Sequence, residues 1–225
     1  MARPMVSDAA VQESRRAFMS RVYGWMFTGL AVTGMVALYV AANNLLPRIV
    51  PFFLPLMLAE FALVWVISGM THRLSGPVAA VLFLVYSVLT GLTFSAIFYR
   101  YTEGSIANAF LMSAGAFGAM SAYATFTKKD LSPWRSFLMM GLIGIIIASI
   151  VQFFVHSPML QFVMGCVGVL VFSGLTAYHT QKLREMHAEA GYSSSGSLSI
   201  AGALMLYLDF INLFISMLRL FGSRR

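Results

Sequence analysis

The sequence predicts an all-α integral membrane protein with seven transmembrane helices, in which the last helix is enclosed by the other six. Of its 225 residues, 59% are hydrophobic and only 10% are charged, whereas soluble domains carry about 25% charged residues. Seven apolar segments are long enough to cross a bilayer, which takes about 20 residues. The final segment also carries a row of polar side chains, which should face protein or water and not lipid.

The seven apolar segments follow one another closely along the chain. They are residues 18–42, 52–70, 78–98, 106–126, 137–155, 160–178 and 200–221. The connections at 43–51, 71–77 and 128–133 are short and contain proline and other turn-forming residues. Only 182–199 is long enough to be mobile, and its Gly-Tyr-Ser-Ser-Ser-Gly-Ser centre predicts a flexible linker. We therefore expect one membrane domain over residues 18–222.

The distribution of lysine and arginine predicts the orientation in the membrane. Short loops on the cytoplasmic side of membrane proteins are enriched in these residues. Arg73, Lys128 and Lys182 all fall on the same side as the N-terminus. We expect residues 1–17 to form a cytoplasmic N-terminal segment and residues 223–225 to form a short tail outside. The tail is itself basic, which argues the other way; a re-entrant last helix or one span fewer would reconcile it.

A polar stripe runs along the last predicted helix. Gly202, Asp209, Asn212, Ser216 and Arg219 recur at helical spacing, which places them on one face, whereas the opposite face is wholly apolar. Such a stripe needs protein or water beside it. For this reason we expect the last helix to be central.

Two charged residues of the predicted spans, Glu60 and Arg219, are expected to pair. An ionisable residue in a span is costly, so each is a candidate functional residue. Glu60 and Asp209 both lie near mid-membrane, and Arg219 lies about 15 Å further along its helix, from where its long side chain could reach Glu60. We interpret Glu60 and Arg219 as a buried ion pair that ties the second helix to the seventh, in preference to a transport role, because buried charges are usually paired.

His179 and Asp209 form the second candidate pair. His179 lies at the cytoplasmic end of the sixth predicted span, where a lone histidine would simply favour the helix C-terminus. Asp209 lies on the next helix along the chain, and an imidazole beside a carboxylate is sensitive to protons at physiological pH. We therefore expect these two residues to act as a pH sensor.

Three runs of residues resemble one family. GLTFS at 91–95, AYHTQKLREM at 177–186 and GALMLYLDFINLFISMLRLFG at 202–222 are similar to the bacterial branch of the Bax inhibitor family, and the resemblance covers essentially the whole chain. It implies a seventh helix enclosed by six others and a pH-sensitive calcium leak across the bacterial inner membrane. Calcium and protons would be its cations, and no cofactor is implied. In this family two aspartates, on the sixth and seventh helices, share a proton near the cytoplasmic mouth and gate the pore.

The sequence departs from that family pattern at one position. Asp209 matches the aspartate of the seventh helix and is the possible cation site, but His179 stands where the other aspartate is expected. A histidine and aspartate pair carries less negative charge than two carboxylates and suits softer ions. Arg73 is the nearest candidate for the arginine that the family places near the cytoplasmic end of the second helix. Glu60 and Arg219 agree with the acidic and basic positions of the family.

Two other classes of function compete with a channel. The first is a non-transporting regulator that binds other membrane proteins, such as quality-control proteases or stress and death factors, as the resemblance also suggests. The second is an enzyme or receptor, which ranks well behind, since the spans contain no HExxH motif and no serine nucleophile elbow. Nucleic acid is not an expected partner, because no basic run with interleaved aromatic residues occurs.

Overall fold

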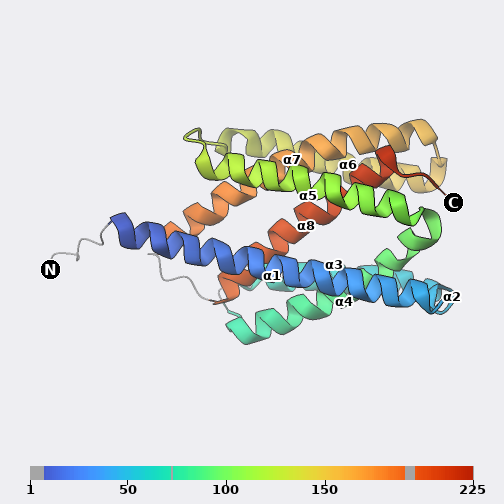
Figure 1. Ribbon diagram of the computed structural model, residues 1–225, viewed down its shortest axis with the longest axis horizontal. Helices are drawn as coiled ribbons and strands as arrows, with labels where there is room; N and C mark the ends of the chain where they lie inside the picture. Colours follow the sequence, from blue (N-terminus) through green and yellow to red (C-terminus); the bar gives the residue numbers. More distant parts are fainter. Residues whose placement is uncertain (1–7, 72, 191–195, 225) are drawn as a thin grey trace.

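The computed structural model describes residues 8–71, 73–190 and 196–224, and these residues form an all-helical bundle (Figure 1). Its elements in chain order are α1 (Asp8–Ala42), α2 (Leu46–Ile49), the 3-10 helix η1 (Val50–Phe52), α3 (Phe53–Gly69), α4 (Gly76–Arg100), α5 (Glu103–Phe126), the 3-10 helix η2 (Ser132–Trp134), α6 (Arg135–Val155), α7 (Pro158–Glu189) and α8 (Gly196–Phe221). In the described part of the chain, seven helical stretches are long and apolar enough to cross a membrane, with α2, η1 and α3 together making the second. The predicted fold class is confirmed.

The last helix is the centre of the bundle, as the polar stripe predicted. Figure 1 shows α8 crossing diagonally between α1, α3 and α4 on one side and α5, α6 and α7 on the other. Within its most apolar window 72% of residues are buried, whereas the other spans reach at most 39%. α8 packs most extensively on α7 and then on α1, α5 and α4, whereas α6 packs chiefly on the outer side of α7.

Two helices are longer than the apolar pattern predicted. α1 begins at Asp8 and α7 continues to Glu189, so most of the predicted mobile segment 182–199 is helical; its central residues 191–195 lie outside the described residues. The projecting ends stabilise each other by packing, since the imidazole of His187 stacks on the ring of Phe18 with centroids 4.5 Å apart. His187 Nε2 also lies 2.9 Å from the Ser14 hydroxyl oxygen. Hydropathy averaged along the chain cannot predict a contact between two residues so far apart in sequence.

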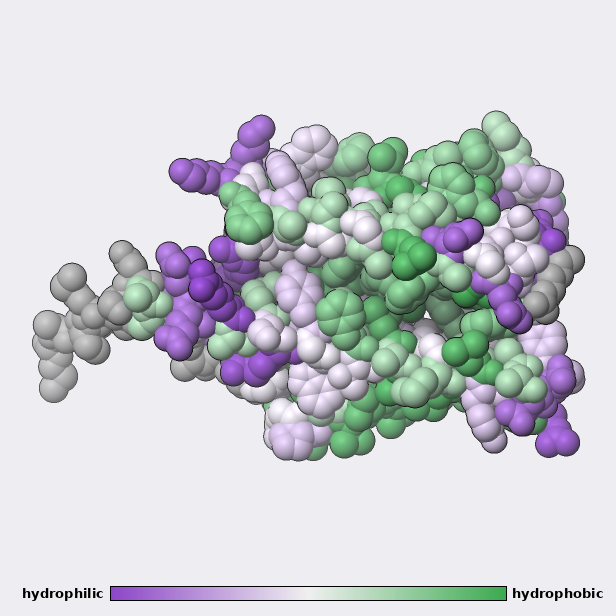
Figure 2. Space-filling view, in the orientation of Figure 1, coloured by the Kyte–Doolittle hydropathy of each residue, from purple (hydrophilic) through white to green (hydrophobic). Residues whose placement is uncertain are grey.

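The surface divides into a hydrophobic band and two polar ends (Figure 2). The band carries large exposed apolar side chains, for example Leu170 and Phe153, each 74% exposed, as expected for a surface that faces lipid. We call the end with the first turns of α1, the α3–α4 connection and the α5–α6 connection the basic end, because it holds Arg15, Arg73 and Lys129. The opposite end holds the connections on either side of α2, between α4 and α5, and between α6 and α7.

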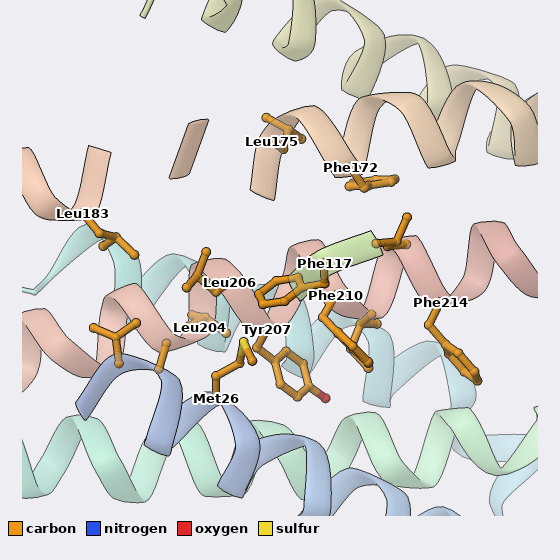
Figure 3. Close-up of a cluster of buried hydrophobic side chains, with 14 of the residues drawn as sticks. Met26, Phe117, Phe172, Leu175, Leu183, Leu204, Leu206, Tyr207, Phe210 and Phe214 are labelled. Atoms are coloured by element: carbon orange, nitrogen blue, oxygen red, sulfur yellow. The ribbon is translucent and has the colours of Figure 1, made fainter. Parts of the chain in front are cut away.

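The core is built around Tyr207 of α8 (Figure 3). Its side chain is fully buried, and the rings of Phe83 and Tyr86 meet it edge-on with centroids 5.8 and 5.6 Å away. The Tyr207 hydroxyl lies 2.6 Å from the hydroxyl of Thr33, which itself donates to the Ser87 carbonyl. Because Thr33 has one hydroxyl proton, Tyr207 donates to Thr33. This chain of bonds joins α8 to α1 and α4.

Candidate functional site

The candidate site is the contact between His179 of α7 and Asp209 of α8. Nδ1 of His179 lies 2.7 Å from Oδ2 of Asp209. The Asp209 side chain is 4% exposed and that of His179 is 18% exposed. Among the described residues, His179 is the sole hydrogen-bond partner of the Asp209 carboxylate. The structure thus brings together the two residues expected to form the protonatable pair.

Close packing of α7 on α8 brings these two side chains together. A Cβ atom added at Gly168 would collide with the Ser216 side chain, and one added at Gly165 would lie 2.7 Å from Leu220. Absence of a side chain at these glycines therefore allows the two helix backbones to approach. Toward the basic end, Leu183 of α7 fills the same interface and is fully buried.

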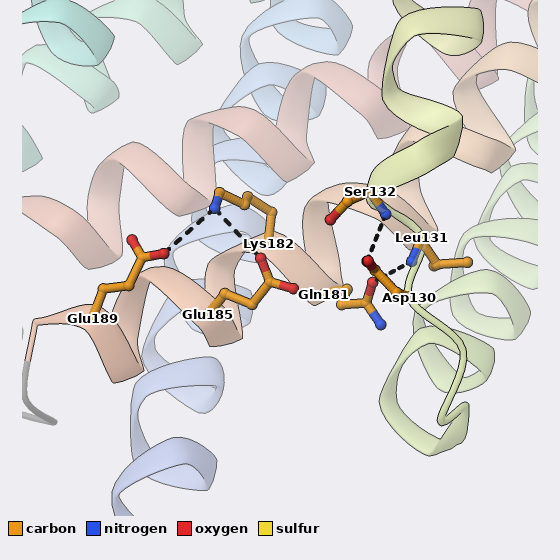
Figure 4. A network of polar contacts seen from close by, with 7 residues as sticks. All are labelled: Asp130, Leu131, Ser132, Gln181, Lys182, Glu185 and Glu189. Carbon is orange, nitrogen blue, oxygen red and sulfur yellow. Dashed lines mark hydrogen bonds and ion pairs between the residues drawn. The ribbon is translucent and has the colours of Figure 1, made fainter.

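A loop fixes α7 immediately beyond His179 (Figure 4). Oε1 of Gln181 accepts a hydrogen bond of 2.8 Å from the backbone N–H of Leu131, and Nε2 of Gln181 donates to the Lys129 carbonyl at 2.9 Å. Asp130 in the same loop accepts from the backbone N–H of Ser132 at 2.8 Å. The α5–α6 connection is therefore tied to α7 two residues from the candidate sensor.

The geometry of the pair determines how it can respond to protons. Nδ1 of His179 faces the carboxylate, so a proton can be gained or lost at Nε2 without removal of the hydrogen bond. With both nitrogens protonated the contact is an ion pair, and with Nε2 deprotonated it is a hydrogen bond to an anion. Gain or loss of a proton at Nε2 would therefore change the net charge of the pair and the attraction between α7 and α8.

The polar stripe continues from this pair along a cavity. A cavity of about 510 Å³ lies between α8 and α6, and Asn212, Ser216 and Arg219 line its α8 side. Asn212 is one helical turn from Asp209. The Asn212 amide and the Ser216 hydroxyl donate to the carbonyls of Leu208 and Asn212 at 2.8 and 2.7 Å.

A second cavity, of about 770 Å³, lies on the other flank of α8, between α1 and α5. Its mouth is visible between these helices in Figure 2. Aromatic rings form its inner wall, with Phe110 of α5 meeting Phe210 and Phe214 of α8 at centroid distances of 5.5 and 6.5 Å. Asn44 and Glu103 line it at the opposite end of the bundle. α8 is thus flanked by space on two sides in the half of the bundle away from the basic end.

The structure does not bring Glu60 and Arg219 together, so the expected ion pair is not formed. Glu60 accepts a hydrogen bond of 3.0 Å from the hydroxyl of Thr93, because α3 packs mainly on α4. Arg219 instead lies beside Gly165 of α7 and lines the α6–α8 cavity. Among the described residues, no ion pair includes either side chain.

Arg73, the possible gate partner, lies apart from the pair. It is exposed at the basic end, just beyond α3, and no hydrogen bond or ion pair joins it to His179 or Asp209. Within the described ranges, no three His, Cys, Asp or Glu side chains gather as they would around a bound metal. Asp209 is therefore a single carboxylate that faces one imidazole.

Comparison with known proteins identifies the family. Residues 15–225 match the family described as inhibitor of apoptosis-promoting Bax1. The chain is 47% identical to the inner membrane protein YbhL of Escherichia coli K12, over 97% of each chain. It is 46% identical to a protein of Deinococcus radiodurans, covering 93% of this chain and 91% of the other, and 40% identical to one of Borreliella burgdorferi, covering 94% of each. With six spans around a buried α8, and with matches of this extent, the chain belongs to the Bax inhibitor-1 family.

Proposed function

We propose that this protein is a pH-sensitive cation leak channel of the bacterial inner membrane, gated by His179 and Asp209. The observation that carries the proposal is the 2.7 Å contact between an imidazole and a buried carboxylate on two adjacent helices. Histidine is the side chain whose ordinary titration falls in the physiological range. A structural scaffold has no need of such a pair inside its core, because an ionisable residue there is costly.

The position of the pair supports a role in permeation. The α6–α8 cavity follows the polar stripe to Asn212, one turn from Asp209. On the other side of the pair, His179 is 18% exposed, and α7 continues past it to Glu189 at the basic end. The contact between α7 and α8 at this pair lies between the end of the cavity at Asn212 and the basic end. A small separation of the two helices would connect them.

The orientation of the path follows from two observations. Lysine and arginine gather in the loops of the basic end, and by the positive-inside rule this favours a cytoplasmic location for that end. YbhL is named an inner membrane protein, and its similarity over nearly the full length supports the same membrane for this chain. The His179 and Asp209 pair would then close the path from the cytoplasmic side.

The charge of the pair sets the direction of gating. When both ring nitrogens of His179 are protonated, the imidazolium holds the Asp209 carboxylate by charge and hydrogen bond together, so α7 and α8 stay in contact. Loss of the Nε2 proton as pH rises leaves only the hydrogen bond and gives the pair a net negative charge. The contact weakens while the site becomes attractive to cations, so we expect flux to rise on alkalinisation.

Flux into liposomes that contain only this protein is the test. Calcium and potassium uptake should be measured with matching dyes between pH 5.5 and 8, for the wild type and Asp209→Asn. The wild type should show a flux that rises with pH, and the variant should show little change with pH. The absence of flux for both ions at every pH, in protein shown to be folded, would remove the channel proposal and leave a regulator of other membrane proteins as the alternative.

A further inference from the structure

We propose that the cavity between α6 and α8 is a binding site for an anionic phospholipid, with the lipid phosphate on Arg219 and an acyl chain along α6. The proposal concerns binding and is independent of whether the protein conducts ions.

The first observation is a half-buried cation that has no ion-pair partner among the described residues. The Arg219 side chain is half-buried, and no acidic side chain of the described residues forms an ion pair with it. The charge that acts on it from a neighbouring arginine, Arg100, has the same sign. Because a partly buried guanidinium in a membrane protein is normally paired, this environment favours an anion supplied from outside the chain.

The second observation is that Arg219 supplies the charged hydrogen-bond donors among the residues that line this cavity. The amide of Asn212 and the hydroxyl of Ser216 donate to carbonyls of their own helix. Guanidinium groups bind phosphate through two parallel hydrogen bonds. A phosphate headgroup therefore matches the polar end of the site.

The third observation is the apolar wall that continues from Arg219 to the lipid-facing surface. Ile146, Ile150, Phe153 and Phe154 of α6 line the cavity and are 52–74% exposed, so it opens toward the hydrocarbon region. Arg219 is two residues from the end of α8, near the level of lipid headgroups, whereas Asn212 lies about 10 Å deeper by helical rise. A ligand with its charge at the rim and an alkyl chain pointing inward fits this arrangement, and a free anion would leave the apolar wall uncovered.

Native mass spectrometry of the purified full-length protein tests the proposal. Phosphatidylglycerol should bind in preference to phosphatidylcholine, because the positive ammonium group of phosphatidylcholine would be repelled by Arg219 and by the neighbouring Arg100. Arg219→Gln should weaken phosphatidylglycerol binding by about tenfold or more, since it removes charged hydrogen bonds. Arg219→Lys keeps the charge but not the two parallel hydrogen bonds, so it should weaken binding less than Arg219→Gln does. Arg48→Gln, which removes an exposed arginine of α2 outside this cavity, is the matched control and should bind like the wild type.

Two further measurements test the site without relying on the Arg219 variants. Ile146→Trp fills the cavity from the lipid-facing side without a change of charge, so it should also reduce phosphatidylglycerol binding even if the Arg219 variants fold poorly. Inorganic phosphate alone should neither bind nor protect the protein from thermal unfolding. Equal binding of both lipids, unchanged binding in Arg219→Gln and Ile146→Trp, or equal protection by inorganic phosphate would each overturn the proposal.

Discussion

His179 and Asp209 form the one ion pair that the described residues place between two helices of the bundle interior, with Nδ1 2.7 Å from Oδ2. The other two ion pairs of the described residues join Lys182 to Glu185 and Glu189 on the surface of α7 (Figure 4). Surface pairs of this kind contribute little, because water screens them. A change in charge at the buried pair acts directly between α7 and α8.

Replacement of His179 by alanine should leave ion flux nearly independent of pH between about 5.5 and 8, the range that histidine controls. His179→Gln should show the same flat profile while it keeps a hydrogen-bond donor near Asp209, which separates loss of the proton from loss of the contact. The measurement is flux into liposomes at several pH values. A full wild-type pH response in His179→Ala would mean that another group is the sensor.

Two substitutions serve as controls for that experiment. His156→Asn removes an exposed imidazole at the opposite end, at a left-handed position with φ of 52° that asparagine tolerates. Asp130→Asn removes a carboxyl whose pKa is held below its usual value by the hydrogen bond from the Ser132 backbone N–H. A depressed pKa gives a contribution that is present above the ordinary value and is lost only as pH falls through the lowered one. Neither control should change the response between pH 5.5 and 8.

Replacement of His179 by aspartate should strengthen calcium binding. The substitution places two carboxylates at the α7–α8 contact, as the family pattern has them, and oxygen ligands are those that calcium prefers. Binding of radioactive calcium to protein in detergent would measure the change. Asn212→Asp, one turn away on the polar stripe, is the matched control for an added negative charge. If Asn212→Asp strengthened calcium binding equally, the added charge and not the paired carboxylates would account for the effect.

The central position of α8 and the importance of Asp209 were predictable because they depend on periodicity. Polar residues at helical spacing within an apolar segment require protein or water beside them, and this argument identified both the enclosed helix and Asp209. The AYHTQK run placed His179 on the preceding helix. The same logic failed for Glu60 and Arg219, because membrane depth gives the level of a residue and not the direction that it faces.

Other contacts had no signal along the chain. The Gln181 side chain forms hydrogen bonds with the Lys129 carbonyl and the Leu131 N–H. Both partners are backbone groups of a loop, and backbone groups carry no pattern that the sequence would reveal. The stacking of His187 on Phe18 joins residues far apart in the chain and packs the start of α1 against the last turns of α7. Such contacts depend on how helices rotate against one another, which hydropathy does not define.

Removal of the charges at Glu60 and Arg219 should have additive effects on stability. The two side chains do not contact each other, since Glu60 bonds Thr93 and Arg219 lines a cavity, and effects of residues without shared partners usually add within about 0.5 kcal/mol. Thermal unfolding of Glu60→Gln, Arg219→Met and the double variant in detergent would show this. Recovery of stability in the double variant would instead reveal an ion pair in solution.

Loss of the Tyr207 hydroxyl should destabilise the bundle modestly. Tyr207→Phe removes the 2.6 Å bond to Thr33 but keeps the ring among Phe83 and Tyr86, and hydrogen bonds between membrane helices contribute about 0.6 kcal/mol on average. Thr33 keeps its bond to the Ser87 carbonyl, so its own proton is still satisfied. Tyr23→Phe near the basic end is the control. A loss above about 3 kcal/mol in unfolding by denaturant would mean that the hydroxyl holds more than this one contact.

A methyl group at Gly168 should separate α7 from α8. The added Cβ would collide with the Ser216 side chain, which sits in a close interface and is almost fully buried. Overpacking of this kind costs about 1–3 kcal/mol, and the two helices must move apart to relieve it. Gly168→Ala should therefore unfold at a lower temperature and also show raised flux at low pH, because the same movement opens the contact of His179 with Asp209.

Gly118→Ala in α5, where nothing lies within 4 Å of the added atom, should leave both quantities unchanged. If Gly168→Ala lowered the unfolding temperature but left flux at low pH at the wild-type level, separation of α7 and α8 near Ser216 would not open the path, and the gate would depend on the pair alone.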